Sequence, residues 1–261
     1  TGGPPTQLVP RGPEGGPPAD AAAAKPAAGG DAAPGATALG DIRKAWATAA
    51  DEDARVRAID QLAGLGQNAL PALDDLVKAL ADENVRIRWH AARAVGAIGE
   101  DALPVVPKLV ALLADPDPIV ATQSAAAIGS IRADDGRKEL PADVASTYNA
   151  AADALAAATV HPDPRVRRAA LRAVGTLRPE ADKLAALVGK QLSDADPAVV
   201  MQSLASLADL GAGAVPMLVE SLKDPKSRYW ATVALTEIGP EAGAATDALT
   251  AAAVKIGRAH V

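Results

Sequence analysis

The sequence contains no cysteine and no phenylalanine, and tryptophan and tyrosine together supply five of its 261 residues. The absence of cysteine excludes disulfide frameworks, thiolate-bound zinc and cysteine nucleophiles. The shortage of aromatic residues excludes an aromatic-rich sandwich or barrel core. No run reaches about 18 uncharged apolar residues, so we expect no membrane-spanning helix.

Alanine is the most abundant residue and occupies 65 of the 261 positions. It has the highest helix propensity and lets helix axes approach closely, so the composition predicts an all-α protein. The formal net charge of −6 argues against a general nucleic-acid binder, although it allows a local basic patch. Packed helices are therefore expected, and nucleic acid is disfavoured as the partner.

The two ends of the chain differ from the middle. Residues 1–37 are rich in Pro, Gly and Ala and nearly lack large apolar side chains, so we expect a disordered linker. Residues 256–261 resemble the translation of a common sequencing adapter, and we expect a non-native tail there. The folded domain is expected to span residues 38–255. The sequence is compatible with the cytoplasm, or with the bacterial envelope after loss of an N-terminal signal or anchor.

One pattern recurs six times within the expected domain and predicts a repeat architecture. Each copy opens with Asp or Asn, the expected N-cap of a helix, and apolar residues follow at helical spacing. A glycine is expected to end four of these helices, whereas Arg132 and Arg178 stand at that position in the third and fourth copies. The opening residues are Asp51, Asn84, Asp117, Asp163, Asp196 and Asp224, and the closing glycines are Gly66, Gly99, Gly211 and Gly239.

A further helix is expected before each of these six. The pattern G-x-x-A-x-P starts at Gly66, Gly99 and Gly211, and each time it precedes another apolar run. Neither helix of such a pair can bury its apolar stripe alone, so the pairs must stack on one another. The sequence therefore predicts an α-solenoid of about six to seven helical hairpins.

The repeat resembles the HEAT repeat, of the short kind found in phycobilisome-lyase-like proteins. Residues 163–177 follow the pattern D-x-x-V-R-x-x-A-x-x-A-L-G-x-I-G nearly throughout, whereas the landmarks of ankyrin and tetratricopeptide repeats are missing. The resemblance implies that the second helix of each pair lines a concave, protein-binding surface. It also implies an Arg–Asp ladder between repeats, which Ala121 and Val200 would interrupt. The arginines in the ladder column are Arg55, Arg88, Arg167 and Arg228.

The face of the second helices opposite their buried stripe is the expected binding surface. It carries more cations than anions although the whole chain is negative, and it holds two Trp and one Tyr. Because Trp, Tyr and Arg dominate interface hot spots, we expect a non-catalytic scaffold that binds an acidic protein segment. Alternatively, Trp89 and Trp230 pack over neighbouring repeats and the arginines only solvate a helix face. The predicted partner-binding residues are Arg86, Trp89, His90, Arg93, Arg165, Arg168, Arg172, Tyr229 and Trp230.

The alternative function is a HEAT-like enzyme module, either bilin-lyase-like or DNA-glycosylase-like. Metal-binding HEAT-like hydroxylases need paired His–Glu motifs, whereas His90 and His161 each stand alone in the sequence. We expect His90 at the surface and His161 in a turn, and His260 falls in the expected tail. No catalytic residue, metal ligand or cofactor is therefore predicted.

Overall fold

The computed structural model describes residues 36–131, 141–177 and 181–258, which contain helices and turns and no strand. The chain divides into two units, Thr1–Gly35 and Ala36–Val261, and the first unit lies outside the described residues. The predicted linker therefore lies almost wholly outside them, and the first helix begins at Ala36. Arg132, Arg178 and His260 also lie outside them.

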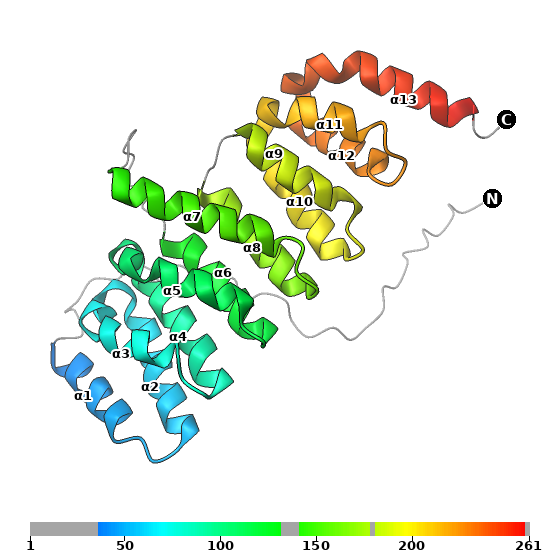
Figure 1. The fold of residues 1–261 in the computed structure, drawn as a ribbon. Helices are drawn as coiled ribbons and strands as arrows, with labels where there is room; N and C mark the ends of the chain where they lie inside the picture. The colour runs from blue at the N-terminus through cyan, green and yellow to red at the C-terminus, as the bar shows by residue number, and fades with distance from the viewer. Residues whose placement is uncertain (1–35, 132–140, 178–180, 259–261) are drawn as a thin grey trace, which may run out of the picture. The chain divides into compact units, whose positions relative to one another are not determined.

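The described residues of the second unit form six helical hairpins and one additional helix, α13 (Thr246–Arg258), as Figure 1 shows. Within each hairpin the two helices pack on each other, and each second helix packs on the second helix of the next hairpin. This arrangement confirms the predicted all-α solenoid of six to seven hairpins. The hairpins pair α1 (Ala36–Ala47) with α2 (Glu52–Leu65), α3 (Leu73–Ala79) with α4 (Val85–Ile98), α5 (Val106–Ala111) with α6 (Pro118–Ile131), α7 (Ala142–Ala158) with α8 (Pro164–Leu177), α9 (Ala181–Gly189) with α10 (Pro197–Leu210), and α11 (Val215–Ser221) with α12 (Arg228–Ile238).

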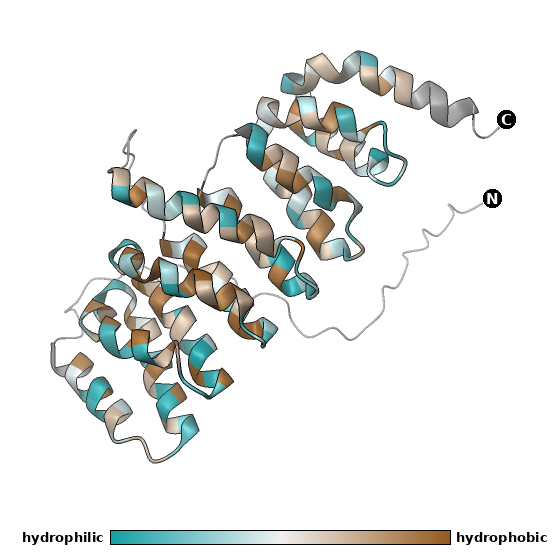
Figure 2. Cartoon of the chain, viewed as in Figure 1, coloured by the Kyte–Doolittle hydropathy of each residue, from teal (hydrophilic) through white to brown (hydrophobic). Residues whose placement is uncertain are grey.

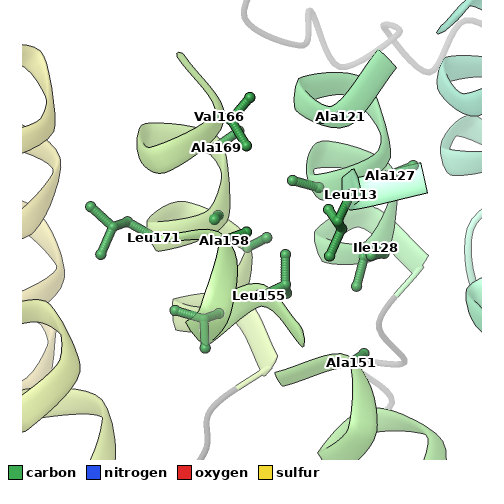
Figure 3. Close-up of a cluster of buried hydrophobic side chains, with 14 of the residues drawn as sticks. Leu113, Ala121, Ala127, Ile128, Ala151, Leu155, Ala158, Val166, Ala169 and Leu171 are labelled. Atoms are coloured by element: carbon green, nitrogen blue, oxygen red, sulfur yellow. The ribbon is translucent and has the colours of Figure 1, made fainter. Parts of the chain in front are cut away.

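The apolar stripe of the second helices forms the core. Ile87, Val120, Val166 and Val199, which occupy the first apolar column in four repeats, are all fully buried. Figure 3 shows how Ile128 of α6, Leu155 of α7 and other apolar side chains meet between the third and fourth hairpins. Hydrophilic residues gather instead at turns, such as the one between α11 and α12 in Figure 2. Stacking therefore buries what a single hairpin would expose.

The ends of the second helices follow the predicted capping pattern with one exception. All six opening residues accept a hydrogen bond from a backbone N–H two or three residues later, and at five of them this bond caps the second helix. Asp224 accepts one from the N–H of Lys226, but α12 begins only at Arg228. The hydroxyl of Ser227 donates to the carbonyl of Ser221, which keeps the residues before Arg228 in a turn. Asp224 therefore caps a turn and not the helix.

The four closing glycines have the positive φ angles that the sequence predicts, between 53° and 81°. The G-x-x-A-x-P segments after three of them form short 3₁₀ helices, Gly66–Ala72, Glu100–Val105 and Gly211–Ala214. The α-helix of each following hairpin begins only after this 3₁₀ turn. The predicted further helices are therefore present, and α3 begins at Leu73, the first residue of the apolar run that follows the pattern.

Two junctions between second helices are unusually close. A Cβ atom added to Gly96 of α4 would lie 2.8 Å from the Cα of Ala127 in α6. A Cβ on Gly129 of α6 would lie 3.1 Å from the Cα of Ala173 in α8. Small residues therefore set the spacing of the repeats on both sides of α6.

Residues Pro197–Ser221 are long and apolar enough to cross a membrane by length and composition alone. In the structure this stretch is α10, a 3₁₀ turn at Gly211 and α11. Its side chains Leu204, Leu207 and Leu218 are buried in the core between hairpins. Part of this apolar stretch therefore belongs to the core of the solenoid, whereas Met201 within it is exposed.

Candidate functional site

We define the second-helix face as the side chains of α2, α4, α6, α8, α10 and α12 that point away from the buried stripe. Its charge differs from helix to helix. The helix α6 carries no charged residue, whereas α8 contributes Arg165, Arg168 and Arg172, which are all exposed. The nine predicted residues therefore fall into three groups, on α4, α8 and α12, with α6 and α10 packed between them.

The group on α4 is a network that reaches back to α2. Asp60 of α2 hydrogen-bonds the Nδ1 of His90 and accepts a hydrogen bond of 2.6 Å from Arg93. The ring of Trp89 stacks on the ring of His90, and the guanidinium carbon of Arg93 lies 5.8 Å from the centroid of the Trp89 ring. One carboxylate thus holds two of the predicted binding residues and links two repeats.

The prediction that His90 lies at the surface is wrong. The residue is only 6% exposed, as is Ala169 at the same repeat position of α8, although Arg57 at that position of α2 is exposed. Burial lowers the pKa of His90, and the hydrogen bond to Asp60 opposes that shift without reversing it. An ionised carboxylate can only accept, so the Nδ1–H of His90 donates to Asp60, and this contact joins α4 to α2.

Two further predicted cations are also paired. Arg86 donates to Glu52 and Asp53 of α2, each at 2.8 Å. Arg165 donates to the carboxylate of Asp163, and this hydrogen bond lowers the pKa of the Asp163 carboxyl to about 2. Glu52 and Asp163 were not among the residues assigned to the expected binding surface, so their charges were not counted when a surplus of cations was predicted there. The positive charge that is available on the second-helix face is therefore smaller than predicted.

The remaining two arginines on α8 have no such partner. Arg168 and Arg172 are exposed, and neither forms an ion pair or hydrogen bond with the described residues. Exposed apolar side chains lie on the two neighbouring second helices: Met201 of α10 at the repeat position of Arg168, and Ile119 of α6 at that of Arg165, with 57% and 39% of their surface accessible. We call these four residues the Arg168 patch. It combines two uncompensated positive charges with exposed apolar surface.

The aromatic pair on α12 forms the third group. Tyr229 and Trp230 meet edge to face with ring centroids 4.9 Å apart. Tyr229 is 67% exposed, whereas Trp230 is partly buried and packs against the core. Trp230 therefore contributes to packing, which was the alternative role expected for it. Tyr229 remains an accessible ring beside Val233 on a groove of about 490 Å³.

The Arg–Asp ladder is present at three junctions between repeats. Each ladder arginine bonds an aspartate two residues before the next N-cap, and Arg88 and Arg167 also donate to carbonyls of the turn in their own repeat. The sequence identified the arginines but not these aspartates, although one signal was available, because each lies 27 residues after its arginine. The pairs are Arg55 with Asp82, Arg88 with Asp115, and Arg167 with Asp194.

The ladder is interrupted where the sequence predicts it. Ala121 and Val200 replace the arginine, and the aspartate of the following turn is replaced as well, by His161 and Leu222. The Nδ1 of His161 accepts a hydrogen bond from the N–H of Asp163, as the ladder aspartates do for the residue two positions later. His161 is therefore a turn residue, as predicted. Among the described residues no group of three or more His, Asp or Glu is placed to hold a metal ion.

Comparison with known proteins places the chain in a family. The family model for HEAT repeats matches residues 41–129 and 151–238, which together cover most of the chain. None of the curated proteins matches the sequence. An engineered protein of known structure is similar in fold, with a TM-score of 0.53 and 22% identity over 77% of this chain and 97% of that one. The complex of CpcE and CpcF of phycocyanin lyase from Nostoc sp. PCC7120 is also similar in fold, with a TM-score of 0.52 and 20% identity over 65% of this chain and 98% of that one. The chain belongs to the HEAT-repeat family.

Proposed function

We propose that this HEAT-repeat protein is a non-catalytic scaffold that binds an acidic, extended segment of a partner protein on its second-helix face. The observation that carries the proposal is the pairing of cations on that face. Arg86, Arg93 and Arg165 are each held by a carboxylate of the chain, whereas Arg168 and Arg172 are exposed and unpaired among the described residues. An acidic partner would supply the negative charge that the described residues do not provide for these two arginines.

The spacing of the two arginines suits a segment with several carboxylates. Residues four apart on a helix have Cβ atoms about 5–6 Å from each other, so both guanidinium groups can bind one short stretch of a partner. Arginine forms bidentate hydrogen bonds with carboxylates, which favours a defined orientation. The uncharged helix α6 offers no competing carboxylate nearby. These features favour acidic side chains at the centre of the bound segment.

The exposed apolar residues of the Arg168 patch favour a segment of mixed character. Ile119 and Met201 stand on opposite sides of α8 in the stack, so a segment that crosses it can bury an apolar side chain on each. Met adapts its shape to different partners and is common on surfaces that bind several of them. The structural likeness to CpcE and CpcF is a likeness of fold and brings no lyase chemistry to this chain.

The test uses a fluorescein-labelled peptide of about ten residues in which Glu and Leu alternate. Its association with the wild-type protein is compared with that of R168E/R172E, which reverses both unpaired charges. We expect at least a tenfold loss of affinity, mainly through slower association, because opposite charges steer the encounter. The matched control is R57E, since Arg57 is also exposed and has no ion pair within the described part of the chain but lies on α2, and it should change affinity less than threefold.

Two results would overturn the proposal. One is an affinity that R168E/R172E leaves unchanged, or that R57E lowers equally. The other is tighter binding of a DNA duplex of matched length than of the peptide, with a steep dependence on salt, which would identify a nucleic-acid-binding face instead.

A further inference from the structure

A pocket of about 570 Å³ lies between α1, α2 and α3, away from the second-helix face. Five residues of α1 line it, among them Arg43, Lys44 and Trp46. The other wall is formed by Lys78 and its neighbours on α3 and by Arg55 of α2. Pockets that bind small molecules typically have volumes of about 300–1,000 Å³, so this one is large enough for a small organic ligand.

The walls of the pocket carry more positive than negative charge. Four cationic side chains line it, and only two carboxylates face them, those of Asp75 and Asp82. Asp75 accepts from Arg43 at 2.7 Å and lies 3.7 Å from the Nζ of Lys78, so a single carboxylate serves both cations. Lys44 forms no ion pair with any described residue. The pocket therefore has uncompensated positive charge that an anion would neutralise.

The pocket also has an apolar side. Trp46 is partly buried against the core and presents part of its surface to the pocket. Gly40, Ala47 and Ala79 line the rest of that side and leave it open, and a Cβ atom on Gly40 would meet no other atom within 4 Å. A flat apolar group can lie there against the indole, which adds stacking to the burial of apolar area.

A second groove between first helices shows that these properties are particular to the α1 pocket. The groove between α9 and α11 has a volume of about 630 Å³, and its two lysines are balanced by Glu220 and Asp224. Glu220 is already paired with Lys223. No aromatic residue lines this groove, and the side chain of Met217 fills the space beside Gly189. Similar position in the repeat therefore does not by itself produce a cationic pocket with an aromatic wall.

We propose that the α1 pocket binds a small organic anion that carries a flat aromatic ring, such as an aromatic carboxylate or sulfonate. The ring lies against Trp46, and Lys44 and Lys78 bind the anionic group. This site is separate from the acidic segment proposed for the second-helix face, so either proposal can fail without the other.

The test follows the indole N–H signals of the 261-residue chain by NMR during titration with 2-naphthoate. The chain has three Trp residues, and the variant W46F assigns the signal of Trp46. We expect a saturable shift of this signal with a Kd below about 1 mM, which is typical of a weak complex with a small ligand. The signals of Trp89 and Trp230 should not shift. The neutral analogue 2-naphthamide should shift the Trp46 signal little, because it lacks the charge.

Substitution of the two lysines tests the source of the affinity. The variant K44Q/K78Q should weaken naphthoate binding at least tenfold, whereas the control K108Q, an exposed lysine of α5 outside the pocket, should not. The proposal is overturned if the Trp46 signal does not move at millimolar naphthoate, if naphthamide shifts it equally, or if K44Q/K78Q keeps the wild-type Kd.

Discussion

Where α8 meets α10 an ion pair joins the two repeats, whereas where α10 meets α12 two apolar side chains occupy the corresponding positions. Arg167 and Asp194 form the first junction, with 14% and 7% of their side-chain surface exposed. Val200 and Leu222 stand at the same places in the second junction and are 3% and 4% exposed. Both partners change together, which indicates that the two positions act as a unit.

The physical reason is the cost of leaving one charge alone. Removing a single partner from a buried ion pair is strongly destabilising, whereas replacing the whole pair with packed apolar side chains is often neutral. The chain uses both solutions in adjacent repeats of one fold. The ladder is therefore one way to join repeats, and its absence at a junction is no defect.

The largest effect is expected from breaking the ionic junction on one side. D194A leaves the guanidinium of Arg167 without its carboxylate and removes the acceptor for the N–H of Asp196, so we expect a loss of about 3 kcal/mol in the free energy of unfolding. Urea unfolding followed by circular dichroism measures it. The exposed Asp209 gives the control D209A, and an equal loss in both variants would contradict this role of the ion pair.

The double variant R167V/D194L sharpens the same comparison, because it copies the apolar junction into the ionic one. Its free energy of unfolding should lie within about 1 kcal/mol of the wild type, above that of D194A. If the double variant is as unstable as D194A, the two junctions are not interchangeable.

A close contact between helices provides the next largest effect. G96A places a Cβ atom 2.8 Å from the backbone of Ala127, so α4 and α6 must separate, at a cost of about 1–3 kcal/mol. The matched control is G175A on α8, where the nearest atom is 3.9 Å away. Because alanine favours helix, G175A should be neutral or stabilising by up to about 1 kcal/mol. Equal melting temperatures for the two variants would refute the close approach.

The ionic junction also predicts a dependence on pH that the apolar junction lacks. Burial raises the pKa of Asp194, but hydrogen bonds from Arg167 and from the backbone of Asp196 outweigh that effect, and the pKa is lowered overall. A lowered pKa means that its contribution to stability is complete above the ordinary Asp pKa of about 4 and is lost as the pH falls below it. Unfolding of R167V/D194L should therefore vary less between pH 5 and 3 than unfolding of the wild type. The same slope in both proteins would contradict the assignment.

The smallest effect compares two serines in the same buried column. The hydroxyl of Ser124 in α6 is buried without a hydrogen-bond partner among the described residues, whereas Ser203 in α10 donates to the carbonyl of Val199 at 3.0 Å. S124A should therefore raise stability by up to about 1 kcal/mol, and S203A should lower it by a similar amount. The two thermal melts shift in opposite directions if this is right, and in the same direction if the hydroxyls are equivalent.

Much of the fold was predictable from the sequence because its determinants are local. An N-cap such as Asp196, an apolar column such as that of Val166 and a closing glycine such as Gly99 each act within one helix, and all are found as predicted. The exception, Asp224, depends on a contact of Ser227 with the preceding helix. Such contacts across a turn are not encoded in the periodicity.

The candidate site was less predictable, because its charges are decided by contacts between repeats. Asp60 lies 30 residues before His90, and no local pattern shows that its carboxylate holds His90 and Arg93 together. Helical spacing places a residue on a face, but it does not reveal whether its charge is already neutralised. Only the packed structure distinguishes Arg168, which has no partner among the described residues, from Arg93, which Asp60 of the preceding repeat holds.

The most direct test of the proposed function is an exchange of charge between protein and peptide. A peptide in which Lys alternates with Leu is titrated into R168E/R172E, alongside the Glu–Leu peptide with the wild type. If the Arg168 patch binds by charge, the Lys peptide binds R168E/R172E at least tenfold more tightly than it binds the wild type. If its affinity is the same for both proteins, Arg168 and Arg172 do not select the partner, and the role of the second-helix face as an acidic-segment site is contradicted.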